Sequence, residues 1–149
     1  MPTDRIEKNI VLSSPISRVW RAISDAREFG AWFGVELEGP LLPGSTVHGQ
    51  ITYPGYEHLR MELWVVEVVP ETYLSYRWRP NAVDVERDYS AEPTTLVELR
   101  LSALADGRTS LSIVESGFDA LPADRRDEAF RSNASGWTEQ VKNIERHVS

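Results

Sequence analysis

Hydrophobic and polar residues alternate along several segments of the chain, which is the pattern of β-strands with one buried face. In residues 5–12, Ile6, Ile10 and Leu12 fall on one side and polar residues on the other. The same criterion predicts strands over about 46–53, 58–69, 73–79, 95–103 and 109–117. Because most of these segments are joined by short turns, neighbouring strands must be antiparallel.

A change to helical spacing follows the first strand. Ser14 is predicted to be the N-cap of a helix, with Pro15 at its first helical position. The apolar positions then recur at i, i+3, i+4 and i+7: Ile16, Val19, Trp20 and Ile23. This helix should end near residues 25–26. A second short helix over 28–33 is expected to present Phe29, Trp32 and Phe33, and to stop at Gly34.

The longest apolar stripe lies at the C-terminal end. A helix starting between residues 123 and 127 would align Phe130, Ala134, Trp137, Val141, Ile144 and Val148 on one face. Gly136 interrupts this helix, which suggests a kink or a close approach of another backbone. Such a helix needs a broad apolar surface to cover.

The order of elements is strand, two short helices, about six strands and a long helix. A one-sided antiparallel sheet needs a cover, and the C-terminal helix is the element long enough to provide it. The pattern therefore predicts an α+β protein with the helix-grip architecture. In it, a curved antiparallel sheet of six to seven strands surrounds a long C-terminal helix, with two short helices after strand 1. We expect residues 1–149 to form a single domain, because 149 residues are a typical domain length.

Composition narrows the classes of partner. The net charge of −7 argues against nucleic acid or an anionic membrane surface as the main partner, because basic groups are not in surplus.

The absence of cysteine excludes disulfides and thiol chemistry. His48, His58 and His147 have no metal-ligand spacing, so we expect neither a metal nor a cofactor. Since no apolar run approaches the ~20 residues of a membrane span, and the first residues lack a signal-like apolar segment, we expect a cytoplasmic protein.

Residues 80–93 are polar and acidic. Asp84, Glu86, Asp88 and Glu92 stand there against Arg87 alone. Clustered charges usually face water, so a solvated loop is expected, with a cation site as the minor alternative.

Several motifs, taken in order, resemble START-like (SRPBCC) domains, and most closely the branch named for the activator of heat-shock protein 90 ATPase. The similarity covers roughly residues 5–148. The motifs are Ile10-x4-Pro15-x3-Val19-Trp20-x3-Ser24-Asp25, Phe29…Trp32, Glu67-Val-Val-Pro70-Glu-x2-Leu74-x-Tyr76-x-Trp78, Thr95-x-Val97-x-Leu99, Gly107-x-Thr109-x-Leu111-x-Ile113-x-Glu115-x-Gly117-Phe118 and Gly136-Trp137. The chain departs from the branch in its longer acidic loop and in Glu115, where the branch often carries histidine.

The resemblance implies a cavity between sheet and long helix. Proteins of this kind mostly bind hydrophobic small molecules, and some relatives are cyclases or aromatases. The co-chaperone activity in the branch's name belongs to a larger protein with an additional N-terminal domain, so the name is not carried over as a function.

Glu115 is the most distinctive candidate residue. It is in phase with Leu111 and Ile113, on the face predicted to meet the helix. A buried carboxylate must find a partner, keep its proton or face a wet cavity. Glu115 is therefore either a polar anchor or acid/base group for a ligand, or a structural residue that reaches solvent or pairs with an arginine where the strand bends before Gly117.

The aromatic residues complete the predicted site. Leu74, Tyr76 and Trp78 share one face of their strand, and Arg77 and Arg79 the other, whereas the run 63–69 is too uniformly apolar to orient Trp64. Plain core packing is the alternative for each aromatic residue. The predicted pocket lining is Trp32, Phe33, Trp64, Tyr76, Trp78, Glu115, Phe118, Phe130 and Trp137.

These observations favour the binding of a small hydrophobic or aromatic molecule in an internal cavity. One alternative is a cyclase/aromatase-like or hydrolase-like enzyme that uses Glu115 and Tyr76. A second is a chaperone-accessory module with a filled interior and an exposed apolar patch. The sequence leaves the oligomeric state open, with a homodimer among the options.

Overall fold

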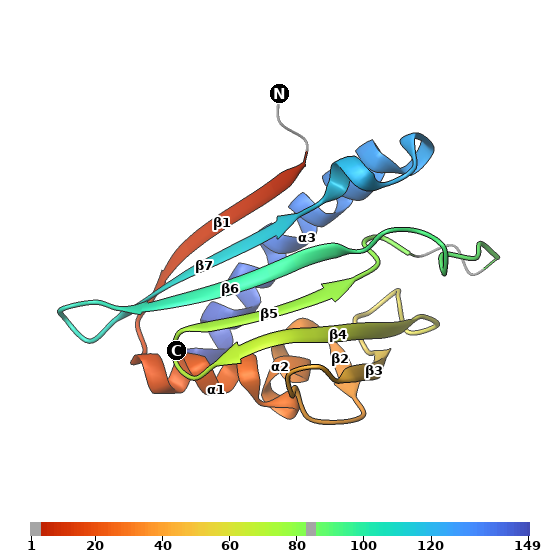
Figure 1. Cartoon of the computed structure of the whole chain (residues 1–149). Coiled ribbons are helices and arrows are strands. Elements are labelled where there is room, and N and C mark those ends of the chain that lie inside the picture. Colours follow the sequence, from red (N-terminus) through yellow and green to blue (C-terminus); the bar gives the residue numbers. More distant parts are fainter. Residues whose placement is uncertain (1–3, 83–85) are drawn as a thin grey trace.

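A seven-stranded antiparallel sheet, ordered β1-β7-β6-β5-β4-β3-β2, carries a long helix across one face (Figure 1). The computed structural model describes residues 4–82 and 86–149. Its elements are β1 (Arg5–Leu12), α1 (Ile16–Ser24), α2 (Ala26–Phe33), β2 (Val35–Leu37), β3 (Thr46–Ile51), β4 (Arg60–Val69), β5 (Tyr73–Trp78), β6 (Thr95–Ala103), β7 (Thr109–Ser116), the short 3-10 helix η1 (Phe118–Ala120) and α3 (Ala123–Val148). The helix-grip class expected from the sequence is confirmed.

The strands pair as the alternation predicts, with one correction in β4. A bulge between Val65 and Glu67 shifts the register with β5, and Met61, Leu63 and Val65 face the core. Trp64 therefore points to the opposite face of the sheet, where the guanidinium of Arg79 lies 4.8 Å from its ring centroid. Its assignment to the pocket is wrong, because the apolar run does not reveal the side-chain phase.

The outer face of the sheet carries a second stack of this kind. The Arg100 guanidinium lies 4.7 Å from the ring centroid of Tyr73, its cross-strand neighbour. Arg77 is exposed on this face as expected, whereas Ser75 is buried and its hydroxyl accepts from the Glu67 backbone N–H.

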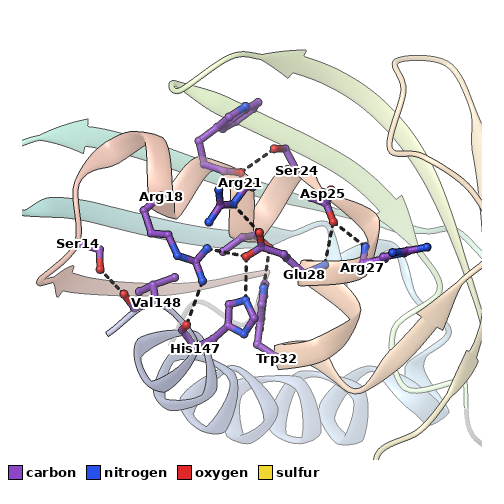
Figure 2. A network of polar contacts seen from close by, with 12 residues as sticks. Ser14, Arg18, Arg21, Ser24, Asp25, Arg27, Glu28, Trp32, His147 and Val148 are labelled. Atoms are coloured by element: carbon purple, nitrogen blue, oxygen red, sulfur yellow. Dashed lines mark hydrogen bonds and ion pairs between the residues drawn. The ribbon is translucent and has the colours of Figure 1, made fainter.

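The start of the first helix differs from the prediction. Pro15 itself is the N-cap residue, and no side chain caps the helix. The Ser14 hydroxyl instead donates to the backbone carbonyl of Val148, the last residue of α3 (Figure 2). Asp25 caps α2 by accepting from the backbone N–H groups of Arg27 and Glu28, so α2 begins at residue 26 rather than 28.

The C-terminal end of α3 is held by a network of charged groups from α1 and α2 (Figure 2). Glu28 accepts hydrogen bonds from Arg18 at 2.5 Å and Arg21 at 2.6 Å, and its carboxylate lies 3.0 Å from the His147 ring nitrogen. Burial alone would raise the pKa of Glu28, but the hydrogen bonds from His147, Arg18 and Arg21 outweigh it and lower that pKa from 4.5 to about 2. Arg18 also donates to the His147 backbone carbonyl, which satisfies part of the helix end.

Both ends of the acidic segment contact α3, through Pro80 and Asn81 on one side and Arg87 and Glu92 on the other. Arg125 is 6% exposed and donates to the Glu92 carboxylate at 2.7 Å. The same guanidinium donates to the backbone carbonyls of Pro80 and Asn81. The expectation of a fully solvated loop is therefore wrong for Glu92, whereas Asp84 lies outside the described residues.

Side chains from both layers fill the space between the sheet and α3. From the helix, Ala129, Trp137, Ile144 and Val148 are buried, and Phe130, Ala134 and Val141 pack partly buried against the same core. Gly136 lies at an exposed position, where an added Cβ would meet no atom within 4 Å, so a close backbone approach is not its role. Within the described part of the chain, no helix is both long enough and apolar enough to cross a membrane.

Candidate ligand-binding groove

A buried carboxylate lies at the junction of three strands and the long helix. Glu115, on β7, has no solvent-exposed surface. Its Oε1 accepts from the Trp137 indole N–H at 2.9 Å, and its Oε2 accepts from the Trp78 indole N–H at 2.8 Å and the Thr95 hydroxyl at 2.6 Å. The Asn133 side-chain amide donates to both oxygens at 3.0 Å.

The folding pattern explains why these groups meet. Trp78 and Thr95 are cross-strand partners of β5 and β6, and Val97 of β6 is the partner of Glu115. Asn133 and Trp137 are four residues apart, so they lie on the same face of α3, one turn from each other. Sequence alternation brings the strand residues inward, and helical spacing brings the amide and indole above them.

Two opposing effects act on the pKa of Glu115. Burial raises the pKa of Glu115 above its usual range, while the hydrogen bonds from Thr95, Trp78, Trp137 and Asn133 act in the opposite direction. Indole and amide N–H groups only donate, so the set is built for a carboxylate. Both structural alternatives from the sequence, a solvent-facing Glu115 and a Glu115–arginine pair, are wrong, because its partners are uncharged.

The two indoles that Glu115 holds are close to each other. The ring centroids of Trp78 and Trp137 are 5.8 Å apart with an interplanar angle of 32°. Phe33, from the end of α2, lies 5.7 Å from Trp78 and 6.2 Å from Trp137 between centroids. The Gln140 side-chain amide donates to the Phe33 backbone carbonyl, which ties α2 to α3 beside these rings. The cluster presents a fixed aromatic surface.

This aromatic surface borders an open groove of about 600 Å³ between α3 and the β3–β4 connection. Its aromatic lining residues are Phe33, Tyr53, Tyr56, Trp78 and Trp137. The remaining lining residues are Gly34, Ile51, Asn81, Glu128, Ser132, Asn133, Ser135, Gly136, Glu139 and Gln140. Space for a ligand therefore lies beside the long helix and opens to solvent, where the sequence predicted a void beneath it.

A second, smaller groove of about 470 Å³ adjoins the first and shares Gly34 and Tyr53 with it. Its lining includes Trp32 and Thr52, with Asn143, Arg146 and His147 from the end of α3. The two grooves differ in their charged residues, because Arg146 lines the smaller one whereas Glu128 and Glu139 line the larger one.

The structure brings only part of the predicted pocket together. Phe33, Trp78 and Trp137 line the larger groove, and Glu115 lies behind the two indoles without lining it. Trp32 lines the smaller groove, and its indole N–H donates to the Ala22 carbonyl at 2.8 Å.

The other predicted aromatic residues lie elsewhere. Tyr76 is 1% exposed and packs against Trp78, and its hydroxyl has no hydrogen-bond partner among the described residues. Phe118 and Phe130 pack on each other with centroids 5.3 Å apart, and neither lines a groove. They pack in the η1–α3 corner, with Phe118 fully and Phe130 partly buried, and belong to the linings of neither of the two grooves.

Sequence reasoning missed four residues of the site. Tyr53 was expected at the end of the strand predicted over 46–53, but β3 ends at Ile51. Tyr53 and Tyr56 both lie in the irregular connection that follows, where periodicity carries no information. Asn133 and Thr95 are polar residues that contact Glu115. Asn133 offered one usable signal, since it stands one helical turn before Trp137.

Within residues 4–82 and 86–149, no group of three or more histidine or acidic side chains is arranged to hold a metal ion.

The fold and the groove define a helix-grip domain with a small-molecule-sized opening beside its long helix. The sequence model of the family described as "Activator of Hsp90 ATPase homolog 1-like protein" matches residues 13–149, so the chain belongs to this family. The comparison with curated proteins gives no match.

Solved structures share the fold at low sequence identity. DynU16, described as a putative protein in the dynemicin biosynthetic locus, is 22% identical with a TM-score of 0.74. The alignment covers 98% of this chain but 47% of DynU16, so this chain spans about half the length of that protein.

Two further structures match over most of both chains. Protein MLL2253 from Mesorhizobium loti is 21% identical with a TM-score of 0.74, covering 96% of this chain and 95% of that one. The Aha1 dimer from Colwellia psychrerythraea, a solution structure, is 12% identical with a TM-score of 0.72, covering 97% and 95%. At such identities the likeness establishes the fold alone.

Proposed function

We propose that the protein binds a small apolar or aromatic molecule in the larger groove. One observation carries the proposal: five aromatic side chains border a space of about 600 Å³, and two of them are fixed by a buried carboxylate. That volume falls within the ~300–1,000 Å³ range of small-molecule sites.

The hydrogen bonds behind the groove support a binding role. Because the indoles of Trp78 and Trp137 are already held by Glu115, a ligand stacking on them loses little side-chain entropy on binding. Asn133, Ser132 and Gln140 offer polar groups that could orient such a ligand. The site combines a fixed apolar wall with a few polar contacts.

A ligand screen tests the proposal. Naphthalene-sized aromatic compounds are expected to raise the melting temperature and to change the tryptophan fluorescence, because Trp78 and Trp137 border the site. Gly136→Leu places a side chain into the groove from a position with open space and should weaken binding at least tenfold.

Glu145→Leu is the matched control, since Glu145 is exposed on the same helix outside both linings. It should leave binding unchanged. A broad panel in which no compound shifts either signal would contradict the proposal.

An enzyme that uses Glu115 and Tyr76 is less well supported. Both side chains are 1% exposed or less, neither lines a groove, and no hydrogen bond joins them among the described contacts. Their burial leaves no reacting pair that a molecule in the groove could touch.

A chaperone-accessory role is a second candidate, favoured by the packed core and by the exposed tyrosines Tyr53 and Tyr56 at the groove. A pull-down with purified chaperone, compared with a Tyr53→Ser/Tyr56→Ser variant, tests it. Co-purification that the two substitutions abolish would support this role over the first.

We also propose that residues 1–149 act as one domain, and that the chain can form a homodimer, which the dimer of the structurally similar Aha1 from Colwellia psychrerythraea supports. A single calorimetric transition and a mass of about 34 kDa, twice the chain mass of 16.9 kDa, are the expected results. Two separated transitions, or the mass of one chain, would contradict the respective proposal.

A further inference from the structure

The larger groove has a one-sided charge pattern. Its charged lining side chains among the described residues are Glu128 and Glu139, and the lining itself contains no lysine, arginine or histidine. Glu139 forms an exposed ion pair at 3.6 Å with Lys142, which lies outside the lining, so Glu128 is the one of the two carboxylates that has no ion pair among the described residues. The basic side chains Arg146 and His147 line the smaller groove, beyond the shared Gly34 and Tyr53. An anionic ligand would find no basic partner in the larger groove.

A third carboxylate reinforces this pattern from inside the protein. Glu115 lies one indole ring behind the groove and accepts the N–H of both Trp78 and Trp137. A carboxylate that accepts an indole N–H polarises the ring, so electron density increases on the π faces. Those faces carry the negative end of the aromatic quadrupole and attract cations.

The aromatic residues are suited to enclose such a cation. Phe33 and the two tryptophans form one side, and Tyr53 and Tyr56, with centroids 6.1 Å apart, form another part of the lining. Aromatic enclosures recognise quaternary ammonium groups in proteins through cation–π attraction.

We propose that the ligand of the larger groove is a small organic cation, an ammonium group carried on an apolar or aromatic body. This inference rests on the proposed binding function and names its ligand class. The ammonium group lies against the accessible part of the Trp78 ring and the exposed Tyr53 and Tyr56, and the apolar body fills the rest of the groove. Glu115 acts as a positioning residue, since it touches the indoles and not the ligand.

Matched ligands test the inference with the natural chain. Phenyltrimethylammonium and tert-butylbenzene have nearly the same shape and differ by one positive charge, and benzenesulfonate supplies a negative one. In titrations followed by tryptophan fluorescence, we expect the cation to bind at least tenfold more tightly than tert-butylbenzene. Benzenesulfonate should bind most weakly.

Variants separate the inner from the outer carboxylates. Glu115→Gln removes the charge and keeps an oxygen acceptor for only one of the two indoles, because the amide NH2 replaces the other oxygen. The preference for the cation should fall at least threefold, and the affinity for tert-butylbenzene reports separately any change in the aromatic wall. Glu128→Gln/Glu139→Gln should reduce only the part of the preference that disappears between about 0.02 M and 0.5 M NaCl, because exposed charges are screened. If Glu115→Gln does not fold, the ligand comparison in the natural chain still decides.

The outcomes are distinguishable. Equal affinity for the cation and its neutral counterpart would overturn the inference and leave the binding function standing. Tighter binding of benzenesulfonate than of the cation would also overturn it. Failure of the cation and tert-butylbenzene, together with every compound of the aromatic panel, would overturn the binding function itself.

Discussion

Replacement of Trp137 by phenylalanine tests whether the buried carboxylate organises the groove. Trp137 is 2% exposed and its indole N–H donates to Glu115 at 2.9 Å. Trp32 is the matched control, because it is 5% exposed and donates to the neutral Ala22 carbonyl at 2.8 Å. Both substitutions remove the same ring atoms and one N–H.

The difference between the two variants isolates the charge on the acceptor. Loss of the ring atoms costs each variant about 1–2 kcal/mol. A hydrogen bond to a charged group contributes about 1.5–3 kcal/mol, against about 0.5–1.5 kcal/mol for a neutral one. Trp137→Phe should therefore lower the free energy of unfolding by about 1–2 kcal/mol more than Trp32→Phe.

Urea unfolding followed by circular dichroism measures both free energies, and pH supplies a second test. The Trp137 N–H stabilises the ionised form of Glu115, so its removal raises the already raised pKa of this carboxyl further. The difference in unfolding free energy between Trp137→Phe and Trp32→Phe should be largest at pH values where Glu115 is ionised. It should shrink as the pH falls through the pKa of Glu115, which lies above 4.5. Equal costs at every pH, or a difference between the two costs that does not change with pH, would refute the reasoning.

Three further predictions concern stability. Gly30→Ala should destabilise the fold by more than about 2 kcal/mol, because its Cβ would lie 2.1 Å from the Val35 carbonyl oxygen. Gly136→Ala should stabilise the fold by about 0.5–1 kcal/mol, because its Cβ would meet no atom within 4 Å and alanine favours the helix. Thermal melts in which both substitutions shift the melting temperature in the same direction would contradict this. Arg125→Ala breaks the ion pair with Glu92, whose side chains are 7% and 9% exposed, and should lower the free energy of unfolding in urea by about 3–5 kcal/mol. Arg108→Ala breaks the ion pair with Asp106, whose side chains are 51% and 54% exposed, and should cause no measurable change. Equal effects of the two substitutions would refute the argument from burial. Because the pKa of Glu28 is lowered to about 2, its contribution of about 1–2 kcal/mol to the free energy of unfolding is complete above pH 4.5 and is lost as the pH falls through 2. Glu28→Gln should remove this part of the acid dependence in unfolding measurements from pH 6 to 2. A variant whose stability curve runs parallel to that of the natural protein would contradict this.

Alternation and helical spacing were sufficient for most of the fold. Strand β6 occupies residues 95–103, as its alternation predicts, and α3 begins within the predicted interval. The three-residue strand β2 was missed, because so short a segment shows no period. The bulge in β4 was missed for a different reason: an apolar run on both sides of a bulge hides the change of phase.

The site was harder to predict than the fold. The phase of Glu115 indicated its burial, because alternation fixes which face a strand residue takes. Its partners come from β5, β6 and α3, and their meeting depends on how the helix is positioned on the sheet. The position of the groove depends on Tyr53 and Tyr56 in an irregular connection, where local sequence does not determine the path of the chain.

The arginine–aromatic stacks on the back of the sheet have a consequence for its behaviour in water. Trp64 and Tyr73 would present flat apolar rings on a surface that no helix protects, but the guanidinium groups of Arg79 and Arg100 cover them. Each arginine therefore works as a hydrated shield for its neighbour, which keeps this side of the sheet from adhering to another protein. The two members of each stack should accordingly change together between related proteins, since a ring without its arginine would be left bare.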